Sequence, residues 1–313
     1  MTAESQAHAG LMPATQSIFK TPELEKEYMA AYEAVLALWP VPHAPLEVQT
    51  QFGTTHVNAC GPQEGPAMLL LPGFGANSTM WFPNIAALSS QFRVYAVDTP
   101  GQPGKSLPAA PVTAHNSHEW LRGVCDGLGL ERATLVGVSL GGWLALKFAV
   151  HVPERVGRVI LLDPAASFER MSAAFVWHSF LPIMVHPTRP SLIKYFRWMT
   201  GGYVVNRDWG ELMVQGVLNT KPQPPIRATP LTDEELRQVQ VPTLLLIGER
   251  SVIYDPQRAY RRATRLIPAI QAEIVPGASH ALNAEKSKLV NERILQFCQA
   301  QVVEEGRRDD LSN

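Results

Sequence analysis

Cysteine is scarce in this sequence of 313 residues, which contains only Cys60, Cys125 and Cys298 and no C-x-x-C pair. Such wide spacing excludes a disulfide scaffold and predicts buried free thiols in a reducing compartment, the cytoplasm. Long hydrophobic runs are also missing, because stretches such as Ala67–Leu71 are far shorter than the roughly 20 residues that a membrane helix needs. The first ten residues lack the basic start and apolar centre of a secretory signal. The sequence therefore predicts no membrane partner.

An excess of charge of either sign is missing too. The 27 Lys and Arg residues balance 28 Asp and Glu residues to a net charge of −1. No global field attracts nucleic acid, so we expect no nucleic-acid partner. The nine histidines form no H-E-x-x-H motif, and His115 and His118 lack further ligand-like neighbours. We therefore expect no metal and no organic cofactor, and the oligomeric state stays open.

Apolar residues make up 46% and charged residues 18% of the chain, as in ordinary globular proteins. From Ala67 onward, short apolar runs alternate with helical stretches, which predicts an α/β fold with a mostly parallel central sheet. The predicted strands are Ala67–Leu71, Arg93–Val97, Ala133–Val138, Val156–Leu162, Thr243–Ile247 and Ala272–Val275. The predicted helices are Ser78–Ser90, Ser117–Leu128, Leu140–His151, Pro256–Leu266 and Leu289–Val302.

Three segments interrupt or extend this pattern. Residues 1–45 read as an N-terminal helical extension, whose helix starts at the cap Thr21 and ends near Trp39. An antiparallel hairpin, Leu46–Phe52 with Thr54–Ala59, then opens a core of residues 46–164 and 241–303. Residues 165–240 form an insertion, which we interpret as a helical cap over the carboxyl edge of the sheet; a second small domain remote from the site is the alternative. Its predicted helical pieces are Ala173–Leu181, Ser191–Met199 and Trp209–Leu218. Residues 304–313 read as a flexible tail.

The strongest local motif is Gly137-Val138-Ser139-Leu140-Gly141, between a predicted strand and a predicted helix. G-x-S-x-G in this position is typical of a nucleophile elbow, a tight turn that lifts the serine hydroxyl out of the sheet. The flanking glycines leave room for the hydroxyl, and the helix N-terminus favours developing negative charge. The motif predicts Ser139 as a catalytic nucleophile.

A serine hydroxyl near its ordinary pKa is a poor nucleophile, so a base must accept its proton. The elbow architecture predicts a histidine late in the chain, after the final strand. His280 fits, because Pro276-Gly277-Ala278-Ser279-His280 follows the predicted strand Ala272–Val275 directly. We therefore predict His280 as the general base.

With these motifs, the chain resembles the α/β-hydrolase family from about Leu46 to Val302, and within that family the bacterial carboxylesterases of the naproxen-esterase kind. The segments that carry the latter likeness are Ser78–Asn84, Tyr95–Asp98, Thr232–Leu236 and Val252–Pro256. The resemblance implies the α/β-hydrolase fold, with an N-terminal antiparallel hairpin and a helical cap insertion, and a carboxylic ester as substrate.

The resemblance also implies an oxyanion hole made by two backbone N–H groups, here those of Phe74 and Leu140. The first belongs to Leu71-Pro72-Gly73-Phe74-Gly75, in which Pro72 replaces the first residue of the family's usual His-Gly. A main-chain donor survives that substitution.

The acid of the triad has more than one candidate, because the family most often places it three residues past a glycine after the seventh strand, where this chain has Ser251. Asp163 ends the sixth predicted strand in a Leu-Asp-Pro-Ala segment that resembles the acid of animal lipases. Asp255 lies in a second Asp-Pro pair that also reads as a helix N-cap. Asp163 is our prediction, Asp255 the alternative and Glu249 the third choice.

These residues predict a serine hydrolase that cleaves a small apolar carboxylic ester through an acyl-enzyme. Cofactor-free carbon–carbon bond hydrolases and haloperoxidases of the same fold, and a non-catalytic ligand receptor or sensor, stay open as alternatives. The insertion contains the aromatic and methionine residues of an apolar pocket, of which we expect about a third to line it. These residues are Phe168, Met171, Phe175, Trp177, Phe180, Met184, Phe196, Trp198 and Met199.

Overall fold

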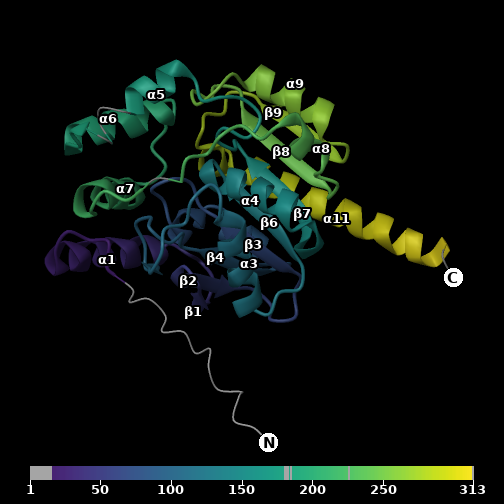
Figure 1. Ribbon diagram of the computed structural model, residues 1–313, viewed down its shortest axis with the longest axis horizontal. Helices are drawn as coiled ribbons and strands as arrows, with labels where there is room; N and C mark the ends of the chain where they lie inside the picture. Colours follow the sequence, from purple (N-terminus) through teal and green to yellow (C-terminus); the bar gives the residue numbers. More distant parts are fainter. Residues whose placement is uncertain (1–15, 180–182, 184, 225, 312–313) are drawn as a thin grey trace, which may run out of the picture.

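A nine-stranded sheet lies at the centre of the computed structural model, which describes residues 16–179, 183, 185–224 and 226–311, with side chains up to residue 300 (Figure 1). The strand order is β1-β2-β4-β3-β6-β7-β8-β9, and β5 pairs with β2. The strands are β1 (His43–Thr50), β2 (Gly53–Cys60), β3 (Ala67–Leu71), β4 (Arg93–Val97), β5 (Leu107–Pro108), β6 (Ala133–Val138), β7 (Val156–Leu162), β8 (Thr243–Gly248) and β9 (Ile270–Val275).

The sheet combines an antiparallel end with a parallel body. Strands β1 and β2 form the predicted hairpin, and β2 also runs antiparallel to β4. From β4 through β3, β6, β7 and β8 to β9, every neighbouring pair is parallel. The predicted fold class is confirmed. The carboxyl ends of β3, β6, β7 and β8 consequently meet at one edge, where ligands of such sheets bind.

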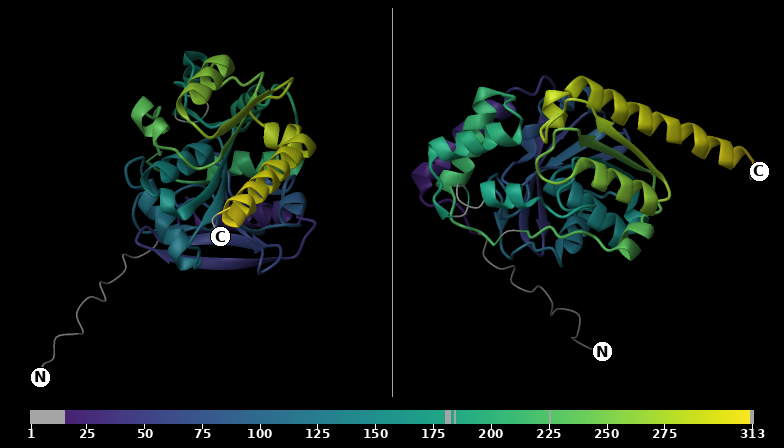
Figure 2. Two further views of the ribbon diagram at one scale, coloured as in Figure 1. Left: turned by 90° about the vertical axis from the view of Figure 1, so that its right-hand side faces the viewer. Right: turned by 90° about the horizontal axis from the view of Figure 1, so that it is seen from above.

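Helices cover both faces of the sheet, as the turned views in Figure 2 show. The helices are α1 (Pro22–Leu36), α2 (Ile85–Leu88), α3 (Ser117–Gly127), α4 (Leu140–His151), α5 (Ala173–Ser179), α6 (Arg189–Met199), α7 (Arg207–Asn219), α8 (Asp233–Arg237), α9 (Pro256–Leu266), α10 (Leu282–Glu285) and α11 (Ser287–Leu311), with short 3₁₀ turns η1 (Ser78–Trp81) and η2 (Pro153–Arg155). Within the described ranges, no helix is both long and apolar enough to cross a lipid bilayer.

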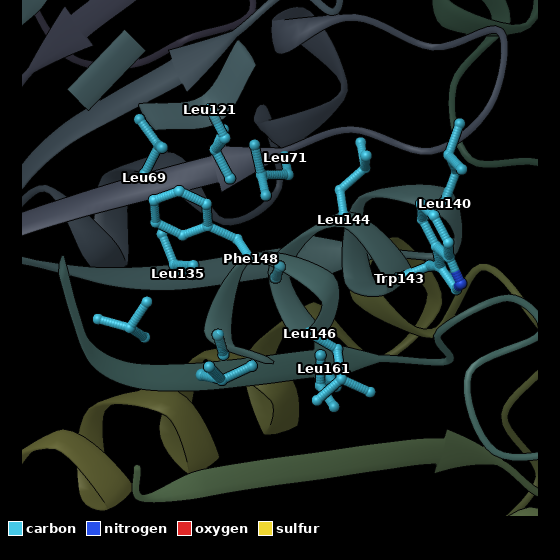
Figure 3. Close-up of a cluster of buried hydrophobic side chains, with 14 of the residues drawn as sticks. Leu69, Leu71, Leu121, Leu135, Leu140, Trp143, Leu144, Leu146, Phe148 and Leu161 are labelled. Carbon is cyan, nitrogen blue, oxygen red and sulfur yellow. The ribbon is translucent and has the colours of Figure 1, made fainter. Parts of the chain in front are cut away.

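The core consists of two apolar clusters, one on each face of the sheet, because successive side chains of a strand point to opposite faces. Leu69 and Leu71 of β3 pack with α3 and α4 in one cluster, part of which is drawn in Figure 3. Met68 and Leu70 of the same strand pack in the other cluster, with α1, α2 and α11. Helix α4, which begins directly after Ser139, contributes many buried apolar side chains to this cluster. Figure 3 shows Leu140, Trp143, Leu144, Leu146 and Phe148 among them.

The predicted helix Ser78–Ser90 is wrong. The chain instead forms the 3₁₀ turn η1, a break, and the four-residue helix α2. Pro83 lies in the break, where it cannot donate a backbone hydrogen bond to continue a helix. The N–H of Ser78 donates to the buried carboxylate of Asp98 over 2.8 Å, which anchors the turn to the end of β4.

The last helix is longer than predicted. Helix α11 begins before Leu289 and continues to Leu311, so the stretch from Glu304 that we expected to lack structure is helical up to that residue. In the sequence, Glu304 and Arg308 stand four residues apart, a spacing that favours helix.

The insertion between β7 and β8 contains α5, α6, α7 and α8, and the first three of these helices lie at the carboxyl edge of the sheet (Figure 1). Helix α1 packs against α7 and buries Tyr28, Tyr32 and Val35. An antiparallel bridge between Phe19 and Thr220 joins the two segments further. The N-terminal helix therefore contacts the insertion as well as the sheet domain. The predicted end of the first insertion helix, at Leu181, lies outside the described residues.

Cys60, Cys125 and Cys298 are free, buried thiols, as the sequence predicted, and burial raises the pKa of each to about 11. We expect iodoacetamide at pH 8 to alkylate them in the unfolded protein but not in the native one, because the thiolate is the reactive form. In the unfolded chain these thiols ionise near pH 8.5, before the folded ones. Their contribution to stability is therefore complete below that pH and is lost as the pH rises through about 11.

Unfolding midpoints measured from pH 8 to 11 check this expectation. The midpoint of the native protein should fall with rising pH, and the fall should be smaller in a variant with all three cysteines replaced by alanine. Equal slopes in the two proteins, or rapid alkylation of the native protein at pH 8, would contradict it.

Candidate active site

Ser139 stands at a sharp turn between β6 and α4. Its backbone has φ 52° and ψ −115°, a conformation that non-glycine residues rarely adopt. The turn is held from both sides: the N–H of Ser139 donates to the carbonyl of Leu162, and its carbonyl accepts from Ala165 over 2.9 Å. The strained backbone therefore persists because the end of β7 fixes it on two sides.

Glycine is required around this turn because the backbone packs too closely for a side chain. A Cβ atom on Gly141 would stand 2.0 Å from the carbonyl oxygen of Leu71, and one on Gly137 would stand 2.2 Å from the backbone of Gly141. Both distances are far below any van der Waals contact. The G-x-S-x-G spacing is thus explained by helix α4 lying directly on the end of β3.

The loop after β3 runs beside Ser139. A Cβ atom on Gly73 would lie 3.5 Å from the Cβ of Ser139, so the loop passes close to the serine at the residue before Phe74. Phe74 and Leu140 both border the cavity that Ser139 faces. Leu140 is the first residue of α4, where backbone N–H groups have no acceptor inside the helix. The N–H of Gly75 is bonded to the side chain of Gln102, a contact that the sequence did not reveal.

His280 lies in the loop after β9 and pairs with Asp163 at the end of β7. Its Nδ1 is 2.5 Å from Oδ2 of the carboxylate, which is fully buried. An ionised carboxylate only accepts hydrogen bonds, so Nδ1 carries the proton and Nε2 is the nitrogen available to act as a base. Asp163 also has a positive φ of 46°, and with Ser139 and Ala166 it completes the set of such non-glycine residues in the described part of the chain.

Three further groups contact the carboxylate of Asp163. The hydroxyl of Ser251 donates to Oδ2 over 2.6 Å, that of Tyr254 donates to Oδ1 over 2.8 Å, and the N–H of Gly248 lies 3.4 Å from Oδ1. Burial, and then the negative charge of Asp163, raise the pKa of Tyr254 well above its usual value, so the phenol stays a donor. No motif in the sequence singles out Tyr254, although it adjoins Asp255 in the segment Val252–Pro256.

The alternative acids lie elsewhere. Asp255 is exposed and caps α9, accepting hydrogen bonds from the N–H groups of Gln257 and Arg258. Glu249 accepts a hydrogen bond from the N–H of Gly277. The structure therefore brings Asp163 to His280, and neither Asp255 nor Glu249.

Ser139 and His280 line one cavity of about 510 Å³ beneath the insertion. Within the described residues, no hydrogen bond joins the two side chains, which is common before a substrate is bound. The cavity wall is mainly apolar and comes from the loop after β3, the elbow and the insertion. Besides the residues already named, it includes Met80, Met171, Phe175, Tyr195, Phe196, Met199, Trp209, Met213, Val217 and Ile226.

The predicted pocket residues have five different surroundings or outcomes. Met171, Phe175, Phe196 and Met199 line the cavity. Phe168 is buried in the core instead, Trp177 is 78% exposed, and Trp198 stacks on His178. Phe180 and Met184 lie outside the described residues. Residue type alone does not separate a cavity wall from the back of the same helix, because both faces are apolar here.

Among the side chains that the structure describes, no group of three or more His, Cys, Asp and Glu residues is arranged to hold a metal ion. His280, which lines the same cavity as Ser139, is instead hydrogen-bonded to Asp163. The chemistry that this arrangement offers is proton transfer beside a hydroxyl, next to an apolar cavity.

A strand-turn-helix elbow at the edge of a mostly parallel sheet, with a late histidine, defines a hydrolase architecture, and the model of the alpha/beta hydrolase family matches residues 68–293. The chain belongs to that family. It is similar to the carboxylesterase YbfK of Bacillus subtilis, with 40% identity over 89% of this chain and 96% of the relative. The predicted hydrolytic enzyme with a likeness to bacterial carboxylesterases is confirmed.

Solved structures agree with the sequence comparison. The crystal structure of carboxylesterase CesB (YbfK) from Bacillus subtilis has a TM-score of 0.83 and 38% identity, over 88% of this chain and 98% of that one. The crystal structure of naproxen esterase (carboxylesterase NP) from the same organism also has a TM-score of 0.83, with 36% identity over 89% of this chain and 99% of that one.

Proposed function

We propose that the protein is a serine carboxylesterase in which Ser139, His280 and Asp163 form the catalytic triad. The observation that carries the proposal is that the His280 ring is bonded to a buried carboxylate and shares an apolar cavity with the serine of a strained elbow. Relatives named as carboxylesterases, at up to 40% identity, support an ester as the substrate.

The reaction proceeds in two halves. Ser139 Oγ attacks the carbonyl carbon of the ester while Nε2 of His280 accepts the hydroxyl proton, and Asp163 stabilises the resulting imidazolium. The N–H groups of Phe74 and Leu140 bind the oxygen that becomes negative. The carbon–oxygen bond to the alcohol then breaks, and His280 returns its proton to the leaving alkoxide. In the second half, His280 accepts a proton from water, and the water oxygen attacks the carbonyl carbon of the acyl-enzyme. The bond to Ser139 Oγ then breaks, His280 returns the proton to Oγ, and the carboxylic acid is released.

The substrate is a small ester with apolar groups on one or both sides of the carbonyl. An apolar wall of Met and aromatic side chains gains free energy from burying apolar surface, roughly 25 cal/mol for each Å². We regard residues 165–240 as the cap of the enzyme, because its helices supply most of this wall. Cap side chains consequently set which acyl and alcohol groups fit.

A fluorophosphonate probe tests the proposal directly. We expect the native protein to be labelled at Ser139, once per chain, and to hydrolyse short p-nitrophenyl esters. Ser139→Ala should neither be labelled nor hydrolyse the esters. The probe should form no covalent adduct at any other serine. Absence of both labelling and ester cleavage in the native protein would contradict the proposal and favour a non-catalytic binding role. Cleavage that persists in Ser139→Ala would show that another nucleophile acts.

A further inference from the structure

The loop after β8 directs two hydroxyl groups at one buried carboxylate. Ser251 Oγ is 2.6 Å from Oδ2 of Asp163, and the Tyr254 hydroxyl is 2.8 Å from Oδ1. Ser251 is 8% exposed and Tyr254 is 4% exposed, so water does not compete freely for these contacts. Neither residue is part of the wall of the cavity that Ser139 faces. Any effect of these hydroxyls on the reaction therefore passes through Asp163.

The carboxylate needs these donors because it is completely buried. A buried charge without hydrogen bonds is costly, and each oxygen of Asp163 has two protein donors in place of water. On Oδ2 these are His280 Nδ1 and Ser251 Oγ; on Oδ1 they are Tyr254 and Gly248. Because the hydroxyls bind different oxygens, they fix the rotation of the carboxylate plane and also stabilise its negative charge.

The backbone keeps the hydroxyl loop beside the histidine loop. The N–H of Arg250 donates to the carbonyl of Ala278 over 2.8 Å, and the N–H of Glu249 donates to the carbonyl of Val275 over 3.1 Å. The close approach is also visible at Gly248, where a Cβ atom would stand 2.4 Å from the carbonyl oxygen of Ser279. These main-chain contacts hold the loop that carries Ser251 beside the loop that carries His280.

We propose that Ser251 and Tyr254 are positioning residues that hold Asp163 in the orientation in which it supports His280. The inference rests on the ester hydrolysis proposed above and adds two residues to it. Both act on the step in which the imidazolium forms and leave substrate binding unchanged, because they touch the carboxylate and not the cavity.

A matched pair of variants isolates the Ser251 hydroxyl. Threonine and valine have nearly the same shape, so Ser251→Thr keeps the donor and Ser251→Val replaces it by a methyl group. We expect Ser251→Val to lower kcat by roughly 10- to 100-fold, the usual range for one hydrogen bond to a charged group, with KM unchanged. Ser251→Thr should retain most of the kcat. Tyr254→Phe should lower kcat by a similar factor, again without a change in KM.

A double-mutant cycle separates positioning from a merely structural role. On an Asp163→Asn background, which retains measurable residual turnover, Ser251→Val and Tyr254→Phe should lower kcat no further, because the group they orient has lost its charge. A structural role would lower the residual turnover by the same factor as in the native protein. Ile253→Val, a buried neighbour without a hydroxyl, serves as the packing control and should lower the unfolding midpoint but not kcat.

The outcomes distinguish this inference from the proposed function. Full activity in Asp163→Asn would overturn the assignment of Asp163 itself. Loss of activity in Asp163→Asn together with wild-type kcat in Ser251→Val and Tyr254→Phe would overturn the positioning role alone. Equal loss in Ser251→Thr and Ser251→Val, or identical factors on both backgrounds, would likewise contradict it.

Discussion

Asp163→Asn is expected to lower kcat for ester hydrolysis by about 10⁴-fold, the size of effect that follows when a triad aspartate loses its charge. Asparagine has the same shape and tolerates the positive φ of this position, so the fold should survive. The amide carries no charge to balance the imidazolium, and its NH₂ group would hold the ring in the wrong tautomer. Steady-state kinetics on a p-nitrophenyl ester measure the loss.

Asp255→Asn is the matched control, because it makes the same chemical change in the other Asp-Pro pair. We expect its kcat to stay within about 2-fold of the native value and its stability to be unaffected, since asparagine caps a helix as well as aspartate does. The reverse result, full activity in Asp163→Asn and loss in Asp255→Asn, would assign the acid to Asp255.

Gly141→Ala is expected to cause the largest loss of stability. Its Cβ would meet the backbone oxygen of Leu71 at 2.0 Å, and neither β3 nor α4 can move without disturbing the core around both. We expect the free energy of unfolding to fall by at least about 3 kcal/mol, the upper range for overpacking. Thermal unfolding should show a midpoint lower by at least roughly 5 °C.

Gly210→Ala provides the contrasting glycine. It lies in α7, and a Cβ there meets nothing within 4 Å. Alanine forms helix better than glycine does, so the free energy of unfolding should stay equal or rise by up to about 1 kcal/mol. The unfolding midpoint should accordingly stay equal or rise slightly. If both substitutions had the same effect, the close approach at the elbow would not be the cause of the glycine requirement.

Sequence order was enough to predict Ser139 and His280 as candidates that the structure places on one cavity, because the elbow motif and the histidine after the last strand have fixed places along the chain. The carboxylate partner of His280 was harder to predict. Asp163 and Asp255 each precede a proline at the end of an apolar run, and no local property separates them. What separates them is the alignment of neighbouring strands: the N–H of Asp163 donates to the carbonyl of Leu246, which places it at the carboxyl end of β8, beside the histidine loop.

The wrong helix prediction and the unpredicted contact of Tyr254 also depend on tertiary contacts. The strands were recognisable because burial on both faces makes them continuous apolar runs. The apolar stretch after Ser78 has the composition of a helix, but its contacts with Asp98 and the proline within it break the helix in two. Tyr254 had no predicted role, since its hydroxyl reaches Asp163 only because β7 and β8 lie side by side.

The contact between α1 and α7 has a consequence for how the enzyme can change its selectivity. One side of α7 carries Trp209, Met213 and Val217 to the cavity, and the helix is braced by α1 and by the bridge from Phe19 to Thr220. A substitution on α1, remote in sequence from Ser139, can therefore alter the width of the binding space by shifting that brace. Libraries aimed at new substrates therefore have reason to include α1, and removing this helix would take away a support of α7, whose side chains line the cavity.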